Sequence, residues 1–190
     1  FRRDQNHDCF QLGVLHCTVE GQSKADRYAP CSLDDLKNTG LDAWALGHVH
    51  ERATLCAAPF IAYSGNAQGL HVNEPGPRGC LRMTAGPQPG GGFACNEDFV
   101  RLGPVQWARV QVELDDVTHL NEVENRMTCA LEEAAEATDP GCEALMARVV
   151  LRGRTPLDAA LRDAPNQEDL AERLAHLQTG TPSVWIKDMV

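Results

Sequence analysis

Short apolar runs separated by loops rich in Gly and Pro are the feature that most constrains the fold of residues 10–103. Runs at 10–16 and 41–46 each have the length and composition of one buried strand. Between them, Ser32 precedes Leu33-Asp34-Asp35-Leu36-Lys37 in the pattern of a short helix with a polar N-cap. Further short apolar runs predict three more strands, at 60–63, 80–84 and 99–102. We therefore expect a mixed α/β organisation.

The pattern changes after Gly103-Pro104. Residues 105–112 alternate with period two, as in a half-buried strand, and a Glu- and Ala-rich stretch over 118–138 predicts an amphipathic helix. The patterns that follow predict a strand at 144–151, helices at 156–162 and 167–178, and a last strand at 184–186 in which Trp185 packs in a core. This β-α-β-α-α-β order favours a small α/β module of its own. We expect two domains, 1–103 and 104–190.

The charge is divided unevenly between these parts. The formal net charge is −10 and the pI is near 5.1, which excludes a generally basic coat for nucleic acid. Residues 1–103 carry −2 of this charge and residues 104–190 carry −8. A local site for a phosphate group is therefore compatible with the first part.

The sequence also indicates the compartment. No apolar stretch has the length of a membrane span, and no signal-like segment precedes the first strand. The eight cysteines are scattered without a CxxC pair, which favours reduced thiols over a disulfide framework. We expect a cytoplasmic protein with no membrane partner.

Three histidines follow predicted strands. His16 ends the first strand, and His48 and His50 lie in Gly47-His48-Val49-His50 after the second. Side chains at i and i+2 of an extended backbone share one face, so His48 and His50 can point into one site. Sites in open α/β sheets collect beyond the carboxyl ends of strands, and imidazoles there suit Mn, Fe or Zn. Ordinary surface or core histidines remain the alternative, because no carboxylate completes a two-ion cage.

Several segments occur in an order that resembles the second half of a calcineurin-like metallophosphoesterase. They are Leu15-His16, Tyr28-Ala29-Pro30-Cys31-Ser32, the stretch 42–50 with its GHVH motif, the stretch 63–69 (YSGNAQG), and Gly79-Cys80-Leu81. More narrowly, the chain resembles the bacterial DNA repair exonucleases related to SbcD, in the YhaO-type branch. The resemblance implies the second half of a metallophosphoesterase α/β sandwich over 1–103, followed by a small α/β capping and DNA-binding module over 104–190.

The resemblance further implies a phosphodiesterase of DNA repair that uses two divalent ions, with manganese expected and iron or zinc as alternatives. It assigns His16 and His48 to the second ion and His50 to the first. Asn66, Gln68 and His71 are expected to contact substrate or DNA. The family's early motifs (DxH, GD, and GNHD with the catalytic histidine) have no counterpart here, and Asn6-His7-Asp8 lacks the preceding Gly. We expect those motifs in a preceding half outside this chain, so the 190 residues alone should be inactive.

The chain also departs from the branch. Leu70 stands where Arg is common and Ser64 where Pro is common; an Arg would supply a fork of donors to phosphate. The spacing of Arg148, Arg152 and Arg154 could present a basic stripe to DNA, although a solvated strand face is the better interpretation.

Two other functions stay open at this point. One is a metallophosphoesterase that acts on nucleotides or phosphoproteins. The other is a non-catalytic capping or interaction module that docks an SMC-like ATPase, the SbcC/YhaN-like subunit. Whether the protein forms a homodimer is also open.

Overall fold

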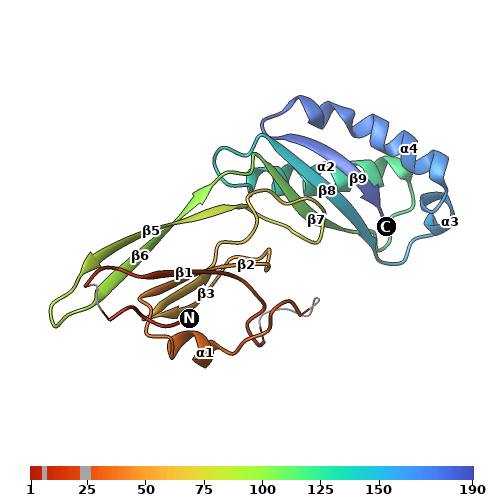
Figure 1. Ribbon diagram of the computed structural model, residues 1–190. Coiled ribbons are helices and arrows are strands. Elements are labelled where there is room, and N and C mark those ends of the chain that lie inside the picture. The colour runs from red at the N-terminus through yellow and green to blue at the C-terminus, as the bar shows by residue number, and fades with distance from the viewer. Residues whose placement is uncertain (6–7, 22–26) are drawn as a thin grey trace. The chain divides into compact units, whose positions relative to one another are not determined.

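The computed structural model describes residues 1–5, 8–21 and 27–190. The chain divides into two compact units, which we describe separately. The first contains residues 1–67 and 78–102, and the second contains residues 68–77 and 103–190. The loop 68–77 therefore belongs to the second unit, although it precedes residue 103 in the sequence. Figure 1 shows the mixed α/β elements, which confirm the expected fold class.

In its described residues, the first unit contains a four-stranded sheet, a two-stranded ribbon and one short helix. Its elements are β1 (Leu12–His16), α1 (Leu33–Lys37), β2 (Ala43–Gly47), β3 (Ala53–Ala57), β4 (Phe60–Tyr63), β5 (Gly79–Pro87) and β6 (Phe93–Arg101). The order in the sheet is β1-β2-β4-β3, with β1, β2 and β4 parallel and β3 antiparallel to β4. β5 and β6 form the antiparallel ribbon. Strand β3 was not expected from the sequence.

The expected helix α1 is stabilised at its start by a reciprocal cap. The Ser32 hydroxyl accepts a hydrogen bond from the Asp35 backbone N–H at 3.1 Å, and the Asp35 carboxylate accepts one from the Ser32 N–H at 2.8 Å. Leu36 is buried, and its carbonyl accepts a hydrogen bond from the Trp44 indole at 3.2 Å. The helix is thereby fixed against β2.

The larger of the two buried apolar clusters in the described part of the first unit lies on the face of the sheet that α1 covers. Trp44, Ile61 and Tyr63 are almost fully buried there, together with Leu36. Strand β1 approaches Trp44 so closely that a Cβ at Gly13 would lie 2.4 Å from the indole ring. Only a glycine lets β1 and β2 pair at this distance.

Strand β1 is an edge of this sheet among the described strands, and it exposes apolar side chains. The exposed fraction is 72% for Val14 and 44% for Leu12. Alternation along the strand places them opposite Gly13, which faces the core. An exposed apolar edge strand is a surface on which another segment can pack.

The second unit is a parallel three-stranded sheet with helices. Its elements are β7 (Val105–Glu113), α2 (Leu120–Glu136), β8 (Ala144–Arg152), α3 (Asp158–Leu161), α4 (Ala164–Arg173), the 3-10 helix η1 (Leu174–Thr179) and β9 (Ser183–Met189). The order β7-β8-β9 is parallel throughout, so the carboxyl ends of the three strands meet at one edge. The expected β-α-β-α-α-β order is confirmed.

One cluster of apolar side chains joins this sheet to its helices. Strand residues such as Val112, Leu145 and Val149 pack with Met127 and Leu131 of α2. Leu161 of α3 and Leu170 of α4 belong to the same cluster. The helices therefore share one face of the sheet.

The expectation that Trp185 packs in a core is wrong. Its neighbour Val184 is 4% exposed and belongs to the cluster, whereas Trp185 is 44% exposed. Successive strand residues point to opposite faces, so burying Val184 turns Trp185 away from the helices.

Two further observations concern membrane-spanning helices and the state of the cysteines. Among the described residues, none of the helices is long and apolar enough to cross a membrane. All eight cysteines lie in the described part of the chain, and each is a free thiol.

Candidate functional site

His16 and His48 are brought together by the pairing of β1 and β2. His16 is the last residue of β1 and lies opposite Gly47, the last residue of β2. The next residue, His48, has its Nδ1 atom 3.3 Å from the Nε2 atom of His16. The two rings meet edge to face, with centroids 5.1 Å apart. Adjacent parallel strands thus deliver two imidazoles to one point at their carboxyl ends.

The backbone at His48 is in an unusual conformation. Its φ angle is +95°, in the left-handed region that side chains with a Cβ rarely adopt. Because the backbone is not extended here, the i, i+2 argument for His48 and His50 does not apply. A strained residue of this kind is typical of functional sites that the surrounding structure holds in place.

Gly47 and Tyr28 shape the space around the two histidines. A Cβ at Gly47 would lie 3.0 Å from Nδ1 of His16, so a larger residue would press on that ring. The Tyr28 ring stacks on His48, with centroids 5.8 Å apart, and meets His16 edge to face at 5.2 Å. The three rings form a small aromatic cluster at the strand ends.

The segment after His16 is held in place by two hydrogen bonds of the Tyr63 hydroxyl. The Tyr63 hydroxyl donates to the Cys17 carbonyl at 3.0 Å and accepts from the Val19 N–H at 2.9 Å. Burial raises the pKa of Tyr63 to about 12, so the hydroxyl stays protonated and able to donate. This fixes the chain immediately beyond His16.

A pair of thiols lies beside the same segment. The Sγ atoms of Cys17 and Cys31 are 3.8 Å apart, and Cys17 is fully buried. Burial, followed by the proximity of Cys17, raises the pKa of Cys31 to about 11. Cys31 is therefore a neutral thiol at physiological pH.

His50 lies in a different set of contacts. Its carbonyl accepts hydrogen bonds from the Asn66 N–H at 3.2 Å and from Nη1 of Arg78. Gly65, with φ +77°, allows this approach, because a Cβ there would lie 2.9 Å from the His50 carbonyl oxygen. Within the described ranges, no group of three or more His, Cys, Asp or Glu side chains is arranged to hold a metal. The structure thus joins His16 to His48 and does not add His50 to them.

Asn66 and Arg78 connect the loop that carries His50 to the segment that precedes β5. Nη1 of Arg78 donates to Oδ1 of Asn66 at 3.1 Å, as well as to the His50 carbonyl. Sequence reasoning selected Asn66 but missed Arg78, because a single Arg before a strand has no distinguishing pattern. Arg78 is the cation that orients the loop carrying His50.

Gln68 and His71 lie in the second unit and make contacts within it. The Gln68 amide donates to the Val105 carbonyl at 2.8 Å and accepts from the Val105 N–H at 3.3 Å, as a neighbouring strand would. His71 Nδ1 accepts from the Asn73 N–H at 3.2 Å, and its Nε2 lies 3.6 Å from a carboxylate oxygen of buried Glu74. These contacts give both residues a structural role, and their role toward substrate stays a prediction.

Two other expectations concern charged or polar residues. Arg148 is bound by both oxygens of Asp188, at 2.5 and 2.7 Å, so its charge is largely compensated. Among the three arginines considered as a stripe, it is therefore the poorest donor to a phosphate backbone. Asn6 and His7 of the Asn6-His7-Asp8 stretch lie outside the described residues.

Comparisons with known proteins point to one group. Residues 107–190 match the family model described as the middle domain of the metallophosphoesterase YhaO. Over 150 residues, the chain is 31% identical to a protein of Bacillus subtilis (strain 168) described as an uncharacterized metallophosphoesterase, YhaO. The match covers 77% of this chain and 34% of that relative, so the chain spans about a third of the length of the curated relative it matches.

Proposed function

Since the chain belongs to the YhaO-type metallophosphoesterases, we propose that it is part of a metal-dependent phosphodiesterase of DNA repair. The proposed substrate is linear DNA, and the reaction is hydrolysis of phosphodiester bonds by two divalent ions, with Mn²⁺ expected. In this proposal His16 and His48 bind one ion, and His50 contributes to the other. Phosphoester hydrolysis is the general activity that the family name implies. That DNA is the substrate is the more specific part of the proposal.

The distance between the His16 and His48 nitrogens is the observation that carries the proposal. Metal–nitrogen bonds of imidazole are about 2.0–2.1 Å, so two imidazoles on one tetrahedral or octahedral ion have nitrogens roughly 3 to 3.4 Å apart. The observed separation of 3.3 Å between His48 Nδ1 and His16 Nε2 fits that range. The donor set is also suitable, because imidazole binds Mn, Fe and Zn.

The surroundings of the pair support a site that accepts a ligand. His16 is exposed and His48 is half-buried, so solvent and a substrate phosphate can reach them. Tyr28 stacks on His48 and limits the rotation of its ring. The positive φ of His48 is a local cost that a ligand-binding role would explain.

Two imidazoles do not complete a two-ion centre. Carboxylate or amide oxygens that bridge and orient the ions must come from other residues, and we propose that they belong to a part of the protein outside this chain. The exposed apolar residues Leu12 and Val14 on the edge strand β1 support that proposal, since a further segment packing there would lie beside His16. When bound, the ions supply a hydroxide nucleophile and polarise the phosphate.

The protein that contains this chain, in full length, provides the test. We expect it to degrade linear duplex DNA in the presence of Mn²⁺. His48→Ala should lower the rate by about 100-fold or more, since even groups that only orient metal ligands contribute about 10–100-fold. His119→Ala is the control, because this exposed histidine lies at the start of α2 in the second unit. Equal rates for His48→Ala and the parent protein would contradict the metal assignment.

A second assay separates DNA from other phosphoesters. The full-length protein is given linear duplex DNA, a mononucleotide, a phosphopeptide and an aryl phosphodiester under the same conditions. Preference for DNA supports the repair nuclease. Hydrolysis of the nucleotide or phosphopeptide, with no action on DNA, would leave the family intact and reject the proposed substrate.

A partner is part of the same proposal. We propose that the full-length protein binds an SMC-like ATPase subunit and that the second unit contributes to the contact. The test is co-purification of the full-length protein with that subunit, with and without substitutions on the exposed face of β8 and β9 around Trp185. Co-purification that Trp185→Ala abolishes supports this assignment, and absence of co-purification rejects it.

A further inference from the structure

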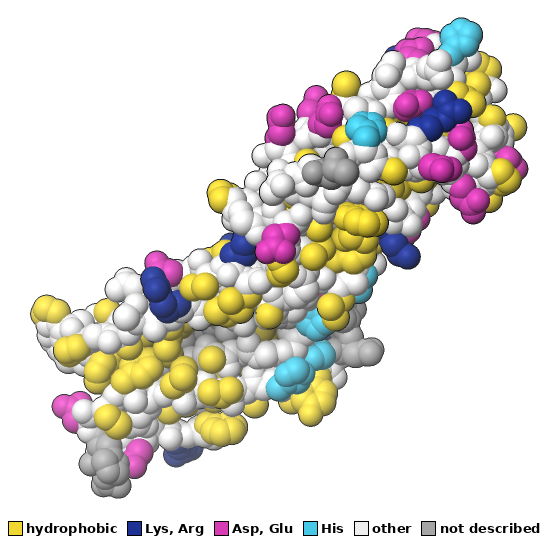
Figure 2. All heavy atoms as spheres, turned by 90° about the horizontal axis from the view of Figure 1, so that it is seen from above, with side chains coloured by type: hydrophobic (Ala, Val, Ile, Leu, Met, Phe, Trp, Pro, Cys, Tyr) yellow, Lys and Arg dark blue, Asp and Glu magenta, His cyan; other side chains and the backbone are white. Residues whose placement is uncertain are grey.

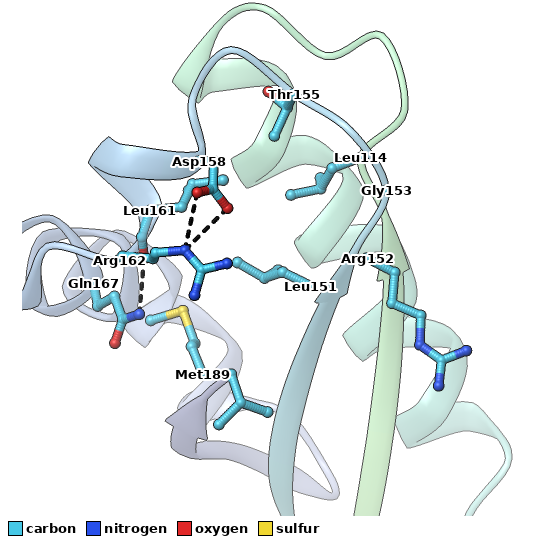
Figure 3. Close-up of a pocket in the computed structure, with 11 residues that line it drawn as sticks. Leu114, Leu151, Arg152, Gly153, Thr155, Asp158, Leu161, Arg162, Gln167 and Met189 are labelled. Atoms are coloured by element: carbon cyan, nitrogen blue, oxygen red, sulfur yellow. Dashed lines mark hydrogen bonds and ion pairs between the residues drawn. The ribbon is translucent and has the colours of Figure 1, made fainter.

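A pocket opens at the edge of the second unit where its three parallel strands end (Figure 3). Its volume is about 360 Å³, which lies within the range of small-molecule sites. Residues from the ends of β8 and β9, the residue that follows β7, and residues of α3 and α4 line it. In open α/β folds, ligands bind beyond the carboxyl ends of the strands, so this is the expected place for one. It shares no residue with the histidine pair of the first unit.

Apolar and polar groups contribute about equally to the walls of the pocket. Leu114, Leu151, Leu161 and Met189 converge on it from different elements, as Figure 3 shows. Leu114 is 1% exposed and Leu161 is 6% exposed, so both are held by the core behind them. Rigid apolar walls suit an apolar body of a ligand and cost little reorganisation when it binds.

Three charged side chains line the pocket, and two of them, Arg162 and Asp158, form an ion pair. Nε of Arg162 donates to both oxygens of Asp158, at 3.1 and 2.9 Å. Figure 3 shows the guanidinium group between Asp158 and Leu151. Because Asp158 engages Nε, the two terminal amino groups of Arg162 stay directed as a fork, which is the geometry that binds a carboxylate with two hydrogen bonds.

The charge around the pocket favours a ligand with one negative charge. Asp158 lies beside Arg162, and residues 104–190 carry a net charge of −8. Acidic side chains are frequent on the part of the surface formed by the second unit in Figure 2. Arg152, the other cation of the lining, points away from Arg162 in Figure 3. A dianion would meet more repulsion here than a monoanion.

We propose that this pocket binds a small carboxylic acid. Its apolar body packs on Leu114, Leu151, Leu161 and Met189, and its carboxylate is bound by the terminal amino groups of Arg162. The site is independent of the proposed nuclease function, since it uses no histidine and lies within one unit.

The test is a titration of the 190-residue protein followed by NMR of its backbone amides. Phenylacetate is the probe, phenylacetamide is the uncharged analogue, and phenyl phosphate is the dianionic analogue. We expect saturable shifts at the residues that line the pocket with phenylacetate. Phenylacetamide should bind about tenfold more weakly, because a hydrogen bond to a charged acceptor is roughly twice as strong as a neutral one. Phenyl phosphate should also bind more weakly than phenylacetate.

The chain offers a matched pair of variants. Arg162→Gln removes the fork, whereas Arg173→Gln removes an arginine whose Nε donates to Asp169 at 2.8 Å with the same i, i+4 spacing, outside the pocket. We expect Arg162→Gln to weaken phenylacetate binding about tenfold, to the level of the amide, and Arg173→Gln to leave it unchanged. Both arginines are on the surface, and unchanged amide spectra verify the fold.

Several results would overturn the proposal. They are the absence of saturable shifts at the pocket, equal affinity for phenylacetate and phenylacetamide, tighter binding of phenyl phosphate, and an equal loss in the two arginine variants. The outcome does not depend on metal or DNA, so it is separate from the outcome for the nuclease.

Discussion

Nε2 of His16 and Nδ1 of His48 lie 3.3 Å apart although 32 positions separate the residues in the chain. The distance is set by the sheet, because His16 pairs with Gly47 across two parallel strands and His48 follows directly. A change that alters the pairing of β1 with β2 will therefore change the site without touching a histidine.

Metal affinity of the 190-residue protein tests whether the pair acts as a unit. We expect Zn²⁺, which accepts imidazole ligands, to bind through His16 and His48. Either His16→Ala or His48→Ala should weaken binding about tenfold or more, and His176→Ala should not. Isothermal titration calorimetry measures the three affinities. Retention of full affinity in both single variants would show that the two rings do not share an ion.

The conformation of His48 predicts an unusual order of stability. Glycine adopts φ +95° at no steric cost, whereas alanine does not. We expect His48→Gly to have a higher free energy of unfolding than His48→Ala by about 1 kcal/mol. The control is His50, whose φ is negative, where the alanine variant should be the more stable one. Urea denaturation of the four variants measures the differences, and the same order at both positions would contradict the prediction.

The close approach of β1 to β2 predicts a large effect of one methyl group. Gly13→Ala would place a Cβ 2.4 Å from the Trp44 ring, and either the ring or the strand must move. We expect a loss of about 1–3 kcal/mol in unfolding free energy. Gly86→Ala is the matched control, since Gly86 is also in a strand and a Cβ there meets nothing within 4 Å. Tryptophan fluorescence during denaturation reports the loss, and equal stability of the two variants would be evidence against the packing.

The raised pKa of Cys31 predicts that this thiol reacts more slowly than the exposed cysteines. Burial and Cys17 raise the pKa of Cys31 from 9.0 to about 11. At pH 8, iodoacetamide should modify the exposed Cys9 and Cys129 well before Cys31, because the thiolate is the nucleophile. The raised pKa stabilises the fold below pH 9, and this contribution is lost as the pH rises toward about 11. Mass spectrometry of peptides from partly alkylated protein gives the order in which the cysteines are modified. Modification of Cys31 before Cys9 and Cys129 would contradict the prediction.

The ion pair between Arg148 and Asp188 predicts that the stability of the fold depends on pH in the acid range. Hydrogen bonds from Arg148 lower the pKa of Asp188, so the pair stabilises the fold above the ordinary carboxyl pKa. This contribution is lost as the pH falls through the lowered pKa. We expect Arg148→Gln to lower Tm at pH 7, with the difference from the parent protein shrinking below about pH 4. A difference in Tm that stays constant from pH 7 to pH 3 would exclude this origin.

Much of the fold could be predicted because local signals and tertiary structure agree. The cap at Ser32 and the alternation over 105–112 each correspond to an observed element. Strand β3 was missed because Ala-Thr-Leu-Cys-Ala has no alternation of apolar and polar residues, and its pairing with β4 identifies it. The same limit explains Trp185, since Val-Trp-Ile gives no sign of which face is buried.

The candidate site could be predicted only in part. The sequence correctly placed His16 and His48 at the ends of strands. That these two strands are neighbours, which brings the rings together, became clear only from the sheet. The turn at His48 and the contacts of Arg78 depend on the backbone path between residues 47 and 79, which no local pattern specifies. Gln68 was selected by resemblance, and its hydrogen bonds to Val105 became visible only with the sheet.

The hydrogen bonds of loop 68–77 set a condition for cutting this protein into pieces. The Gln68 amide occupies both backbone groups of Val105, and the Gly69 carbonyl accepts from the Trp107 indole at 2.9 Å. A truncation that begins at residue 104 would remove these partners from the edge strand β7 and leave it open to association with other copies. The second unit should instead be excised as two segments rejoined by a linker, with 68–77 placed before 103–190. The second unit is thus defined by which segments contact each other in space, and no single cut along the chain separates it from the first.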